Sequence, residues 1–269
     1  MTNRHSSWLL AVAVAVALVL TAPSAAFATE QAPGSDYVAL GDSYSAGVGA
    51  GDYDRASGVC QRSAVSYPEL WAKDHEPSSF AFVACSGART DDVLADQLDA
   101  LDHGTDLVSI TVGGNNAGFG EVMTTCVLKT EAACTARIDT ARGHIADTLP
   151  AELDEVYEAV RERAPQARVV VLGYPRFYRL QGTCVVGLSE AKRGAINTAA
   201  ELLNEVTAKR AADHGFTFVD AAAAFTGHEI CSGSSWLHSL SPTRLTDSYH
   251  PTAPGQSGGY LPAFTAVAS

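Results

Sequence analysis

Two residues far apart in the chain have the types that acyl-transfer chemistry needs. Ser43 follows a short apolar run, residues 37–40, and a Gly-Asp pair. A serine hydroxyl is a weak nucleophile until a base removes its proton. His250 is the candidate base, and the carboxylate of Asp247, three residues before it, can hold the second ring nitrogen. Ser43, His250 and Asp247 therefore form a candidate catalytic triad.

Four motifs occur in a fixed order along the chain. They are Gly41-Asp42-Ser43 after the first expected strand, Gly87 after the second, Gly113-Gly114-Asn115 after the third, and Asp247-x-x-His250 near the end. In this order the sequence resembles the SGNH (GDSL-type) hydrolases, in particular the secreted lipases and esterases of actinobacteria. The resemblance implies hydrolysis of carboxylic esters through an acyl-enzyme on Ser43, with no metal or organic cofactor.

The same resemblance implies an oxyanion hole, the set of donors that stabilises the negative oxygen of the tetrahedral intermediate. Its donors would be the backbone amides of Ser43 and Gly87 and the side-chain amide of Asn115. Each residue also has a purely structural explanation. Gly87 suits a strand-to-helix turn with positive φ, and an isolated asparagine such as Asn115 often caps a turn.

Two departures from the family pattern affect the expected site. The family's usual Gly-x-Asn-Asp ends here in Asn116, so a neutral amide replaces a carboxylate behind the oxyanion hole. Some family members also use a main-chain carbonyl two residues before the histidine in place of the acidic residue. That carbonyl would be the one of Ser248, which is the alternative to Asp247 as the group that orients His250.

Two other segments could be mistaken for parts of the machinery. The stretch Gly255-Gln256-Ser257-Gly258-Gly259 matches a nucleophile elbow, but no strand pattern precedes it and no histidine follows it. We expect it to be the turn into a C-terminal helix. His238 is the one competitor for the base, and it lacks the Asp-x-x-His-Pro context of His250.

Residues 1–28 have the pattern of a secretory signal peptide. Arg4 supplies a positive charge, residues 8–20 are apolar, and Ala26-Phe27-Ala28 fits a cleavage site with small residues at its first and third positions. The apolar run is shorter than the ~20 residues of a spanning helix, so an uncleaved membrane anchor is the less favoured alternative. We expect a secreted, extracellular protein whose residues 29–269 form one SGNH hydrolase domain.

The formal net charge of the chain is −12 at pH 7. A field of this sign repels nucleic acid and disfavours long-lived attachment to anionic membranes. Solubility of a secreted protein is the simpler reason for such a charge. We expect a monomer that acts on a small-molecule or lipid ester and does not insert stably into a membrane.

Six cysteines in an exported chain predict three disulfides, for which fifteen pairings are formally possible. We choose nearest-neighbour pairing, and family relatives with six cysteines look similar in this respect. The pairs are then Cys60 with Cys85, Cys126 with Cys134, and Cys184 with Cys231. Metal binding is the alternative, but the chain has no Cys-x-x-Cys or His-x-x-x-His spacing to support it.

Strand and helix patterns alternate along the chain. Strands are expected at residues 36–40, 79–84, 107–112, 168–172 and 216–219, and helices at residues 67–75, 91–101, 138–160 and 189–213. Pro150 is expected to open a second helix within the third of these helical stretches, and residues 117–134 have no clear pattern. Right-handed crossovers give a three-layer α/β/α sandwich around a parallel five-stranded sheet. The flavodoxin-like strand order 2-1-3-4-5 comes from the family.

The ester that this chemistry would cleave is less well specified. We favour a lipase or esterase, with a phospholipase or an acetyl-polysaccharide esterase as alternatives on the same scaffold. A catalytically inert secreted binding domain is the alternative from a different class. An apolar acyl groove is expected from loop residues Val127, Leu128, Phe177, Tyr178, Leu180, Val185, Val186 and Leu188.

Overall fold

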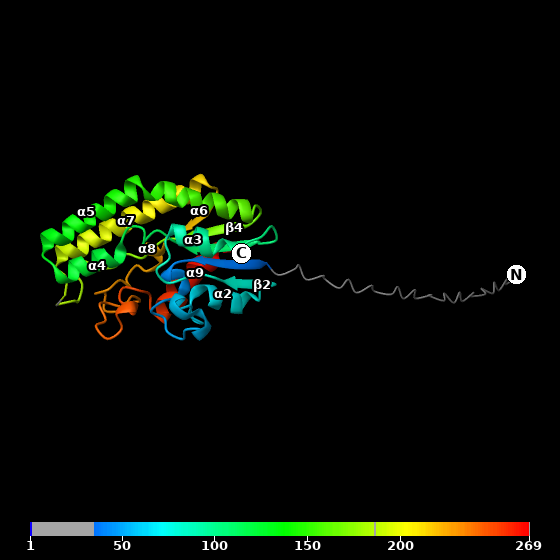
Figure 1. Cartoon of the computed structure of the whole chain (residues 1–269). Coiled ribbons are helices and arrows are strands. Elements are labelled where there is room, and N and C mark those ends of the chain that lie inside the picture. The colour runs from blue at the N-terminus through cyan, green and yellow to red at the C-terminus, as the bar shows by residue number, and fades with distance from the viewer. Residues whose placement is uncertain (2–34, 186, 269) are drawn as a thin grey trace. The chain divides into compact units, whose positions relative to one another are not determined.

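The computed structural model describes residues 1, 35–185 and 187–268 (Figure 1). Residues 2–28 of the expected signal peptide and Val186 of the expected acyl groove lie outside the described residues. From residue 35 onward the described residues belong to one compact unit.

Five strands form the central sheet in the order β2-β1-β3-β4-β5, which confirms the predicted order. They are β1 (Asp36–Gly41), β2 (Ser79–Phe82), β3 (Leu107–Thr111), β4 (Arg168–Leu172) and β5 (Thr217–Val219). All four neighbouring pairs run parallel. A parallel sheet is covered on both faces, so its central strands are continuously apolar. In β4, for example, Val169, Val170 and Val171 are all buried.

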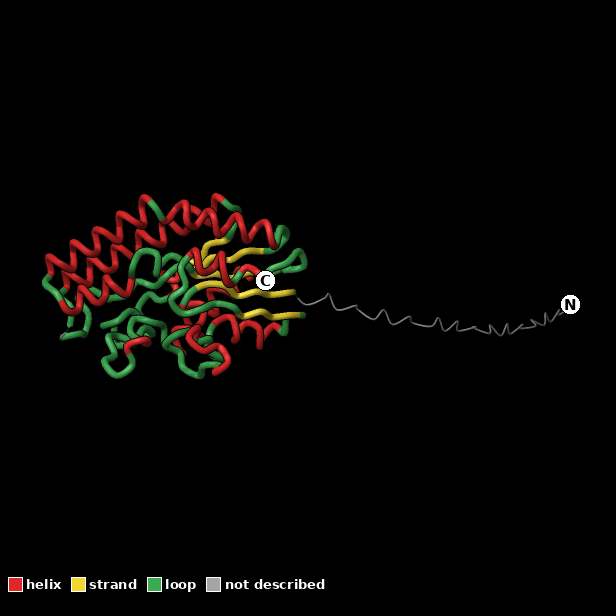
Figure 2. The backbone as a smooth tube through the Cα atoms, viewed as in Figure 1, coloured by secondary structure: helices red, strands yellow, loops and turns green. Residues whose placement is uncertain are grey.

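Helices cover both faces of this sheet, so the sandwich has three layers (Figures 1 and 2). The α-helices are α1 (Ser43–Ala46), α2 (Tyr67–His75), α3 (Thr90–Asp96), α4 (Phe119–Leu128), α5 (Glu131–Asp147), α6 (Leu149–Arg163), α7 (Glu190–Asp213), α8 (Ala221–Ala224) and α9 (Leu261–Ala268). Shorter helical turns are η1 (Arg55–Cys60), η2 (Leu98–Ala100), η3 (Leu245–Asp247) and η4 (Gly255–Tyr260). In Figure 1, α3, α6 and α7 lie on one side of the sheet and α2 and α9 on the other.

The helix expected at residues 91–101 is shorter than predicted. α3 ends at Asp96, and a 3₁₀ turn, η2, follows. Between them the buried side chain of Gln97 accepts the Gly41 amide at 2.7 Å and donates to the Gly41 carbonyl at 2.9 Å. Helical periodicity alone could not reveal the break, because a polar residue here serves the backbone of another segment.

The segment without a clear pattern, residues 117–134, contains α4 and the beginning of α5. The disulfide between Cys126 and Cys134 joins these two helices. Pro150 stands in the first turn of α6, as predicted, where its missing amide hydrogen removes no helical hydrogen bond.

The structure contains all three disulfides in the nearest-neighbour pairing. Cys60 is bonded to Cys85, Cys126 to Cys134, and Cys184 to Cys231. The first bond ties η1 to the segment that follows β2, two residues before Gly87. The third joins the loop after β4 to the loop after α8. None of these three bonds joins two strands.

The carboxyl ends of the strands meet at one edge of the sheet. The turn after β1 carries Ser43, the turn after β2 carries Gly87 and the turn after β3 carries Asn115. β1 and β3 approach closely there, because Gly41 has a φ of +120° and a side chain on it would collide with the Thr111 carbonyl. Ligands of open α/β sheets bind outside this edge.

Candidate active site

The candidate nucleophile stands at the start of a one-turn helix. Asp42 precedes α1 and caps it, because its Oδ1 accepts the Tyr44 amide at 2.9 Å. The cap turns the chain sharply after β1 and places Ser43 in the wall of a pocket. Within the described part of the chain, the Ser43 amide has no hydrogen-bond acceptor.

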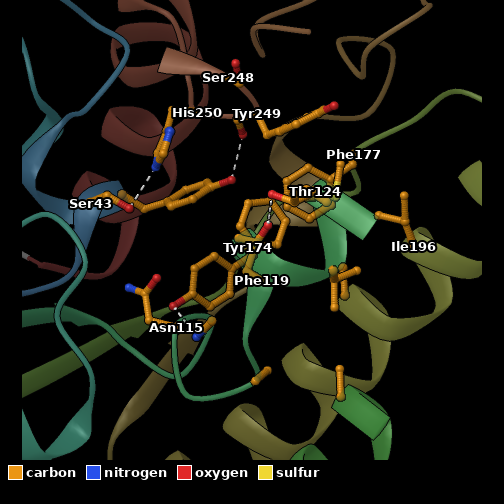
Figure 3. A pocket seen from close by; sticks show the side chains of 18 of the residues that line it. Ser43, Asn115, Phe119, Thr124, Tyr174, Phe177, Ile196, Ser248, Tyr249 and His250 are labelled. Atoms are coloured by element: carbon orange, nitrogen blue, oxygen red, sulfur yellow. Dashed lines mark hydrogen bonds between the residues drawn. The ribbon is translucent and has the colours of Figure 1, made fainter. Parts of the chain in front are cut away.

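His250 lies directly against this serine. Its Nε2 is 2.8 Å from the Ser43 hydroxyl oxygen, although 207 positions separate the two residues in sequence (Figure 3). Burial lowers the pKa of the His250 ring to about 4, and main-chain groups of Thr246 and Ser248 oppose this effect only in part. The ring is therefore neutral at neutral pH, as a general base must be before it accepts a proton.

Asp247 does not make the contact expected of it. Its carboxylate makes no hydrogen bond to the imidazole and pairs with Arg244, whose Nε lies 3.0 Å from Oδ2. The main chain of Asp247 does bond to the base, because its carbonyl accepts the His250 amide at 3.1 Å. Nδ1 of His250 has no hydrogen-bond partner among the described residues.

Three hydrogen-bond donors line the pocket beside Ser43. The amides of Ser43 and Gly87 both lack an acceptor in the described residues. Gly87 adopts a φ of +84°, which few other residues tolerate. The Asn115 side chain uses one amide hydrogen on the Ala88 carbonyl, at 2.9 Å, and keeps the second for a ligand. These are the donors that the family resemblance implied.

Asn116 has a role that explains its difference from the family pattern. Its Nδ2 donates to the Thr90 hydroxyl at 2.7 Å and to Glu152 Oε2 at 2.9 Å, and its Oδ1 accepts the Thr90 amide at 3.2 Å. An aspartate could not donate to Glu152. The carboxylate behind the oxyanion hole thus comes from α6, and nothing in the local sequence indicated Glu152.

A buried carboxylate links the nucleophile turn to the turn after β3. Asp42 accepts hydrogen bonds from the Thr111 hydroxyl at 2.6 Å and from the Tyr174 hydroxyl at 2.5 Å. The Tyr174 oxygen in turn accepts the amide of Gly114, the neighbour of Asn115, at 3.1 Å. Burial raises the pKa of Asp42 to about 6, and these hydrogen bonds reduce the shift. Asp42 was visible in the sequence only as part of a motif, and Tyr174 not at all.

Tyr44 connects the nucleophile turn to the loop of the base. Its hydroxyl donates to the Tyr249 carbonyl at 2.8 Å, and its ring centroid is 5.3 Å from that of His250. The Tyr249 carbonyl belongs to the peptide bond that carries His250. Tyr249 itself has a φ of +68°, a left-handed conformation that large side chains seldom adopt. The Tyr44 hydroxyl therefore stabilises a backbone conformation on which the position of His250 depends.

The remaining candidates lie outside the catalytic arrangement. His238 Nε2 bonds to the Gly49 carbonyl at 2.8 Å, and the His238 amide donates to the His250 carbonyl at 2.9 Å. It supports the loop of the base without facing Ser43. Ser257 is exposed in η4 and bonds to the Ala253 carbonyl, so it is no nucleophile elbow. In residues 35–185 and 187–268, no three His, Cys, Asp or Glu side chains gather as a metal site would require.

A pocket of about 670 Å³ contains the candidate groups. Ser43, His250 and Asn115 gather at one end of it, and Ile196 of α7 lies at the other (Figure 3). Its lining is mostly apolar, as is usual for sites that take small apolar ligands. Ser43, His250 and Asn115 stand at the end where an ester carbonyl would meet the nucleophile.

Replacement of Tyr44 by phenylalanine should lower kcat about tenfold, which corresponds to about 1.4 kcal/mol, with little change in KM. The hydroxyl holds the peptide of the base, and the ring that fills the space remains. Tyr37→Phe is the matched control, because the Tyr37 hydroxyl makes one buried bond, to Ser109, outside the pocket. Both variants should lose about 1 kcal/mol of stability. Equal kcat values in the two variants would refute the role of Tyr44.

Asp247→Asn should lower kcat about tenfold or less, because the carboxylate bonds to Arg244 and not to the imidazole. A triad aspartate that orients its histidine is worth about 10⁴ in kcat when replaced by asparagine. The kcat of His250→Ala on the same soluble ester is the reference for an enzyme that has lost its base. A loss of several thousandfold in Asp247→Asn would show that the carboxylate orients the ring during catalysis.

Comparisons with known proteins agree with this geometry. The family model described as GDSL-like Lipase/Acylhydrolase matches residues 39–257. A lipase from Streptomyces rimosus is 59% identical over 98% of this chain and 98% of its own.

Solved structures point to the same family. A phospholipase A1 from Streptomyces albidoflavus is 63% identical, with a TM-score of 0.86, and matches 87% of this chain and 100% of its own. An extracellular lipase from Streptomyces rimosus is 63% identical, with a TM-score of 0.85, over 87% of this chain and 99% of its own. The chain therefore belongs to the GDSL-like lipase/acylhydrolase family.

Proposed function

We propose that this protein is a lipase or esterase that hydrolyses carboxylic esters through an acyl-enzyme on Ser43. The observation that carries the proposal is the 2.8 Å contact between the Ser43 hydroxyl and His250 Nε2, at the polar end of an apolar pocket. An inert binding domain would have no need for a serine paired with a neutral buried imidazole. An inert domain would also not need the Ser43 and Gly87 amides and the second Asn115 amide hydrogen to be free at the same end of the pocket.

The reaction proceeds in two halves. Ser43 Oγ attacks the ester carbonyl while His250 Nε2 takes the hydroxyl proton, and the amides of Ser43, Gly87 and Asn115 stabilise the oxyanion. The C–O bond to the alcohol then breaks, and His250 returns the proton to the leaving oxygen. A water molecule, deprotonated by His250, attacks the acyl-serine in the same way. Release of the free acid regenerates Ser43 with its proton.

The orientation of His250 requires an acceptor for the hydrogen on its Nδ1. When Nε2 accepts a proton from Ser43, Nδ1 already carries one, and a buried N–H without a partner is costly. Main-chain groups of Thr246 and Ser248 both oppose the fall in the His250 pKa. Of the two, the Ser248 carbonyl is the one that stands two residues before the histidine. We assign this carbonyl to orient the imidazole in the reacting state, with the charge of Asp247 as a weaker aid.

The acyl chain of the ester occupies the apolar part of the pocket. Of the loop residues expected to form the groove, Val127, Leu128 and Phe177 line the pocket. The other described members of that set do not line it, namely Tyr178, Leu180, Val185 and Leu188.

The far wall of the pocket comes from helices instead of loops. The apolar residues Met123 of α4, Ala141 and Ile145 of α5, and Ile196, Ala200 and Leu203 of α7 form it. Because these wall residues are apolar, they suit an aliphatic acyl chain.

This pocket favours medium or long acyl chains over acetate. An acetyl group would leave the space between α5 and α7 without an apolar ligand. The acetyl-polysaccharide alternative is therefore the less favoured one. A phospholipid also carries long acyl chains, and one similar protein is named phospholipase A1. Triacylglycerol and phospholipid thus remain substrates of one proposed class, esters of long-chain acids.

We further propose that the protein acts outside the cell. All six cysteines are paired in three disulfides, which persist in oxidising compartments. One relative at 63% identity is named an extracellular lipase. Among the described residues, no helix is long and apolar enough to span a bilayer.

A fluorophosphonate probe should label the intact protein covalently, because Ser43 is activated by His250. Labelling should disappear in Ser43→Ala and fall by several orders of magnitude in His250→Ala. Ser257→Ala is the control serine variant and should label like the parent. Absence of labelling in the parent protein would favour the inert binding domain.

Ala200→Phe should shorten the acyl chains that the enzyme accepts. A phenyl group at this buried position in α7 fills part of the pocket. The ratio of kcat/KM on a long-chain ester to that on an acetyl ester should fall about tenfold or more. Ala191→Phe, an exposed substitution on the same helix, is the control and should leave the ratio unchanged. An unchanged ratio in Ala200→Phe would place the acyl chain elsewhere.

A further inference from the structure

Exposed large apolar side chains gather at the opening of the pocket. Leu128, Leu240 and Leu245 have exposed fractions of 70%, 42% and 68%. All three border the pocket that contains Ser43. Between residues 35 and 268, the described large apolar residues that are comparably exposed and lie outside the pocket are Val59, Leu180 and Val185. Single exposed leucines are ordinary, but a group around one opening indicates a contact surface.

The three leucines come from segments far apart in the sequence. Leu128 ends α4, whereas Leu240 and Leu245 belong to the loop that leads to His250. In Figure 1 the end of α4 and this orange loop lie at the same end of the molecule. We call the surface formed by Leu128, Leu240 and Leu245 the leucine rim.

Two cations accompany the rim. Lys129 follows Leu128 and Arg244 precedes Leu245, and both side chains are exposed. The Lys129 ammonium makes no ion pair within the described residues. Arg244 uses its Nε on Asp247, which leaves the other guanidinium nitrogens facing solvent. Apolar side chains with neighbouring cations are the composition of surfaces that enter lipid next to phosphate groups.

We propose that the leucine rim is the surface by which this enzyme docks onto phospholipid, so that acyl chains pass from the lipid layer into the pocket. The proposal rests on the proposed function and adds the physical form of the substrate. The leucines enter the apolar layer, and Lys129 and Arg244 meet lipid phosphates. A net charge of −12 opposes approach to an anionic surface, so the surface is zwitterionic.

A protein occupant fits this surface less well. A protein bound over the rim would close the opening through which the substrate reaches Ser43. A lipid surface leaves no such conflict, because the substrate is part of the surface. The leucine side chains are removed from water when they enter the lipid. In that orientation the opening of the pocket faces the lipid.

The test measures binding of the Ser43→Ala protein to phosphatidylcholine vesicles by sedimentation, so that hydrolysis does not alter the vesicles. In this background, Leu128→Ser with Leu245→Ser should weaken the partition into vesicles about tenfold or more. Val59→Ser with Leu180→Ser is the matched control. Those residues have exposed fractions of 86% and 46%, lie outside the pocket, and should change the partition less than about twofold. Lys129→Gln should weaken binding less than the leucine pair does.

Three results of the vesicle measurement would overturn the proposal. These are no partition of the Ser43→Ala protein, equal losses for the rim and control pairs, or a loss in Lys129→Gln as large as in the rim pair. Rim-dependent self-association or protein binding without vesicle binding would overturn it as well. Thermal unfolding of each variant shows whether it is folded, and single rim substitutions replace the pair if the pair unfolds.

Activity of the Ser43-containing parent on a soluble short-chain ester separates the two proposals. If that ester is hydrolysed but vesicle binding does not depend on the rim, only the docking surface is refuted. If the ester is not hydrolysed, the proposed function fails whatever the vesicles show. With both proposals correct, the rim pair lowers the ratio of activity on vesicles to activity on the soluble ester.

Discussion

The buried carboxylate of Asp42 is the constraint on which the site depends. It accepts hydrogen bonds from the Tyr44 amide and from the hydroxyls of Thr111 and Tyr174. A carboxylate away from water is costly without such donors, and the rise of its pKa to about 6 shows that burial still outweighs them. Each donor comes from a different segment, namely the nucleophile turn, β3 and the loop after β4. The Asp42 carboxylate therefore holds these three segments in position relative to one another.

Through Tyr174 the same carboxylate reaches the oxyanion donors. The Tyr174 hydroxyl accepts the Gly114 amide, and the next residue, Asn115, faces the pocket. On the other side Tyr44 holds the carbonyl before His250. The nucleophile, the base and an oxyanion donor are thus joined by short chains of buried hydrogen bonds. Catalysis by fixed dipoles requires such rigidity, because donors that must reorient stabilise the transition state less.

The apolar pocket and the leucine rim depend on different parts of the fold. The pocket continues from the sheet edge to the space between α4, α5 and α7, and the Cys126–Cys134 disulfide joins two of these helices. The rim belongs to surface segments at its opening. Side chains in the pocket can thus determine which acyl-chain length is accepted. Side chains of the rim determine whether the enzyme takes its ester from a lipid layer. The two selections can be changed separately.

The sequence pattern by itself located the five strands and the groups nearest to the chemistry, and the family resemblance supplied the strand order. Ser43, Gly87 and Asn115 follow strands directly, so a periodicity that locates the strands also locates these residues at one edge. Tertiary structure decided the rest. Asp247 pairs with Arg244, and Asn116 donates a hydrogen bond to Glu152 on α6. Asp42 accepts a hydrogen bond from Tyr174, and residues of α5 and α7 form the far wall of the acyl pocket. Most of these partners are distant in sequence. Which side chains bond to each other depends on their directions and distances in space, and local sequence patterns do not encode these.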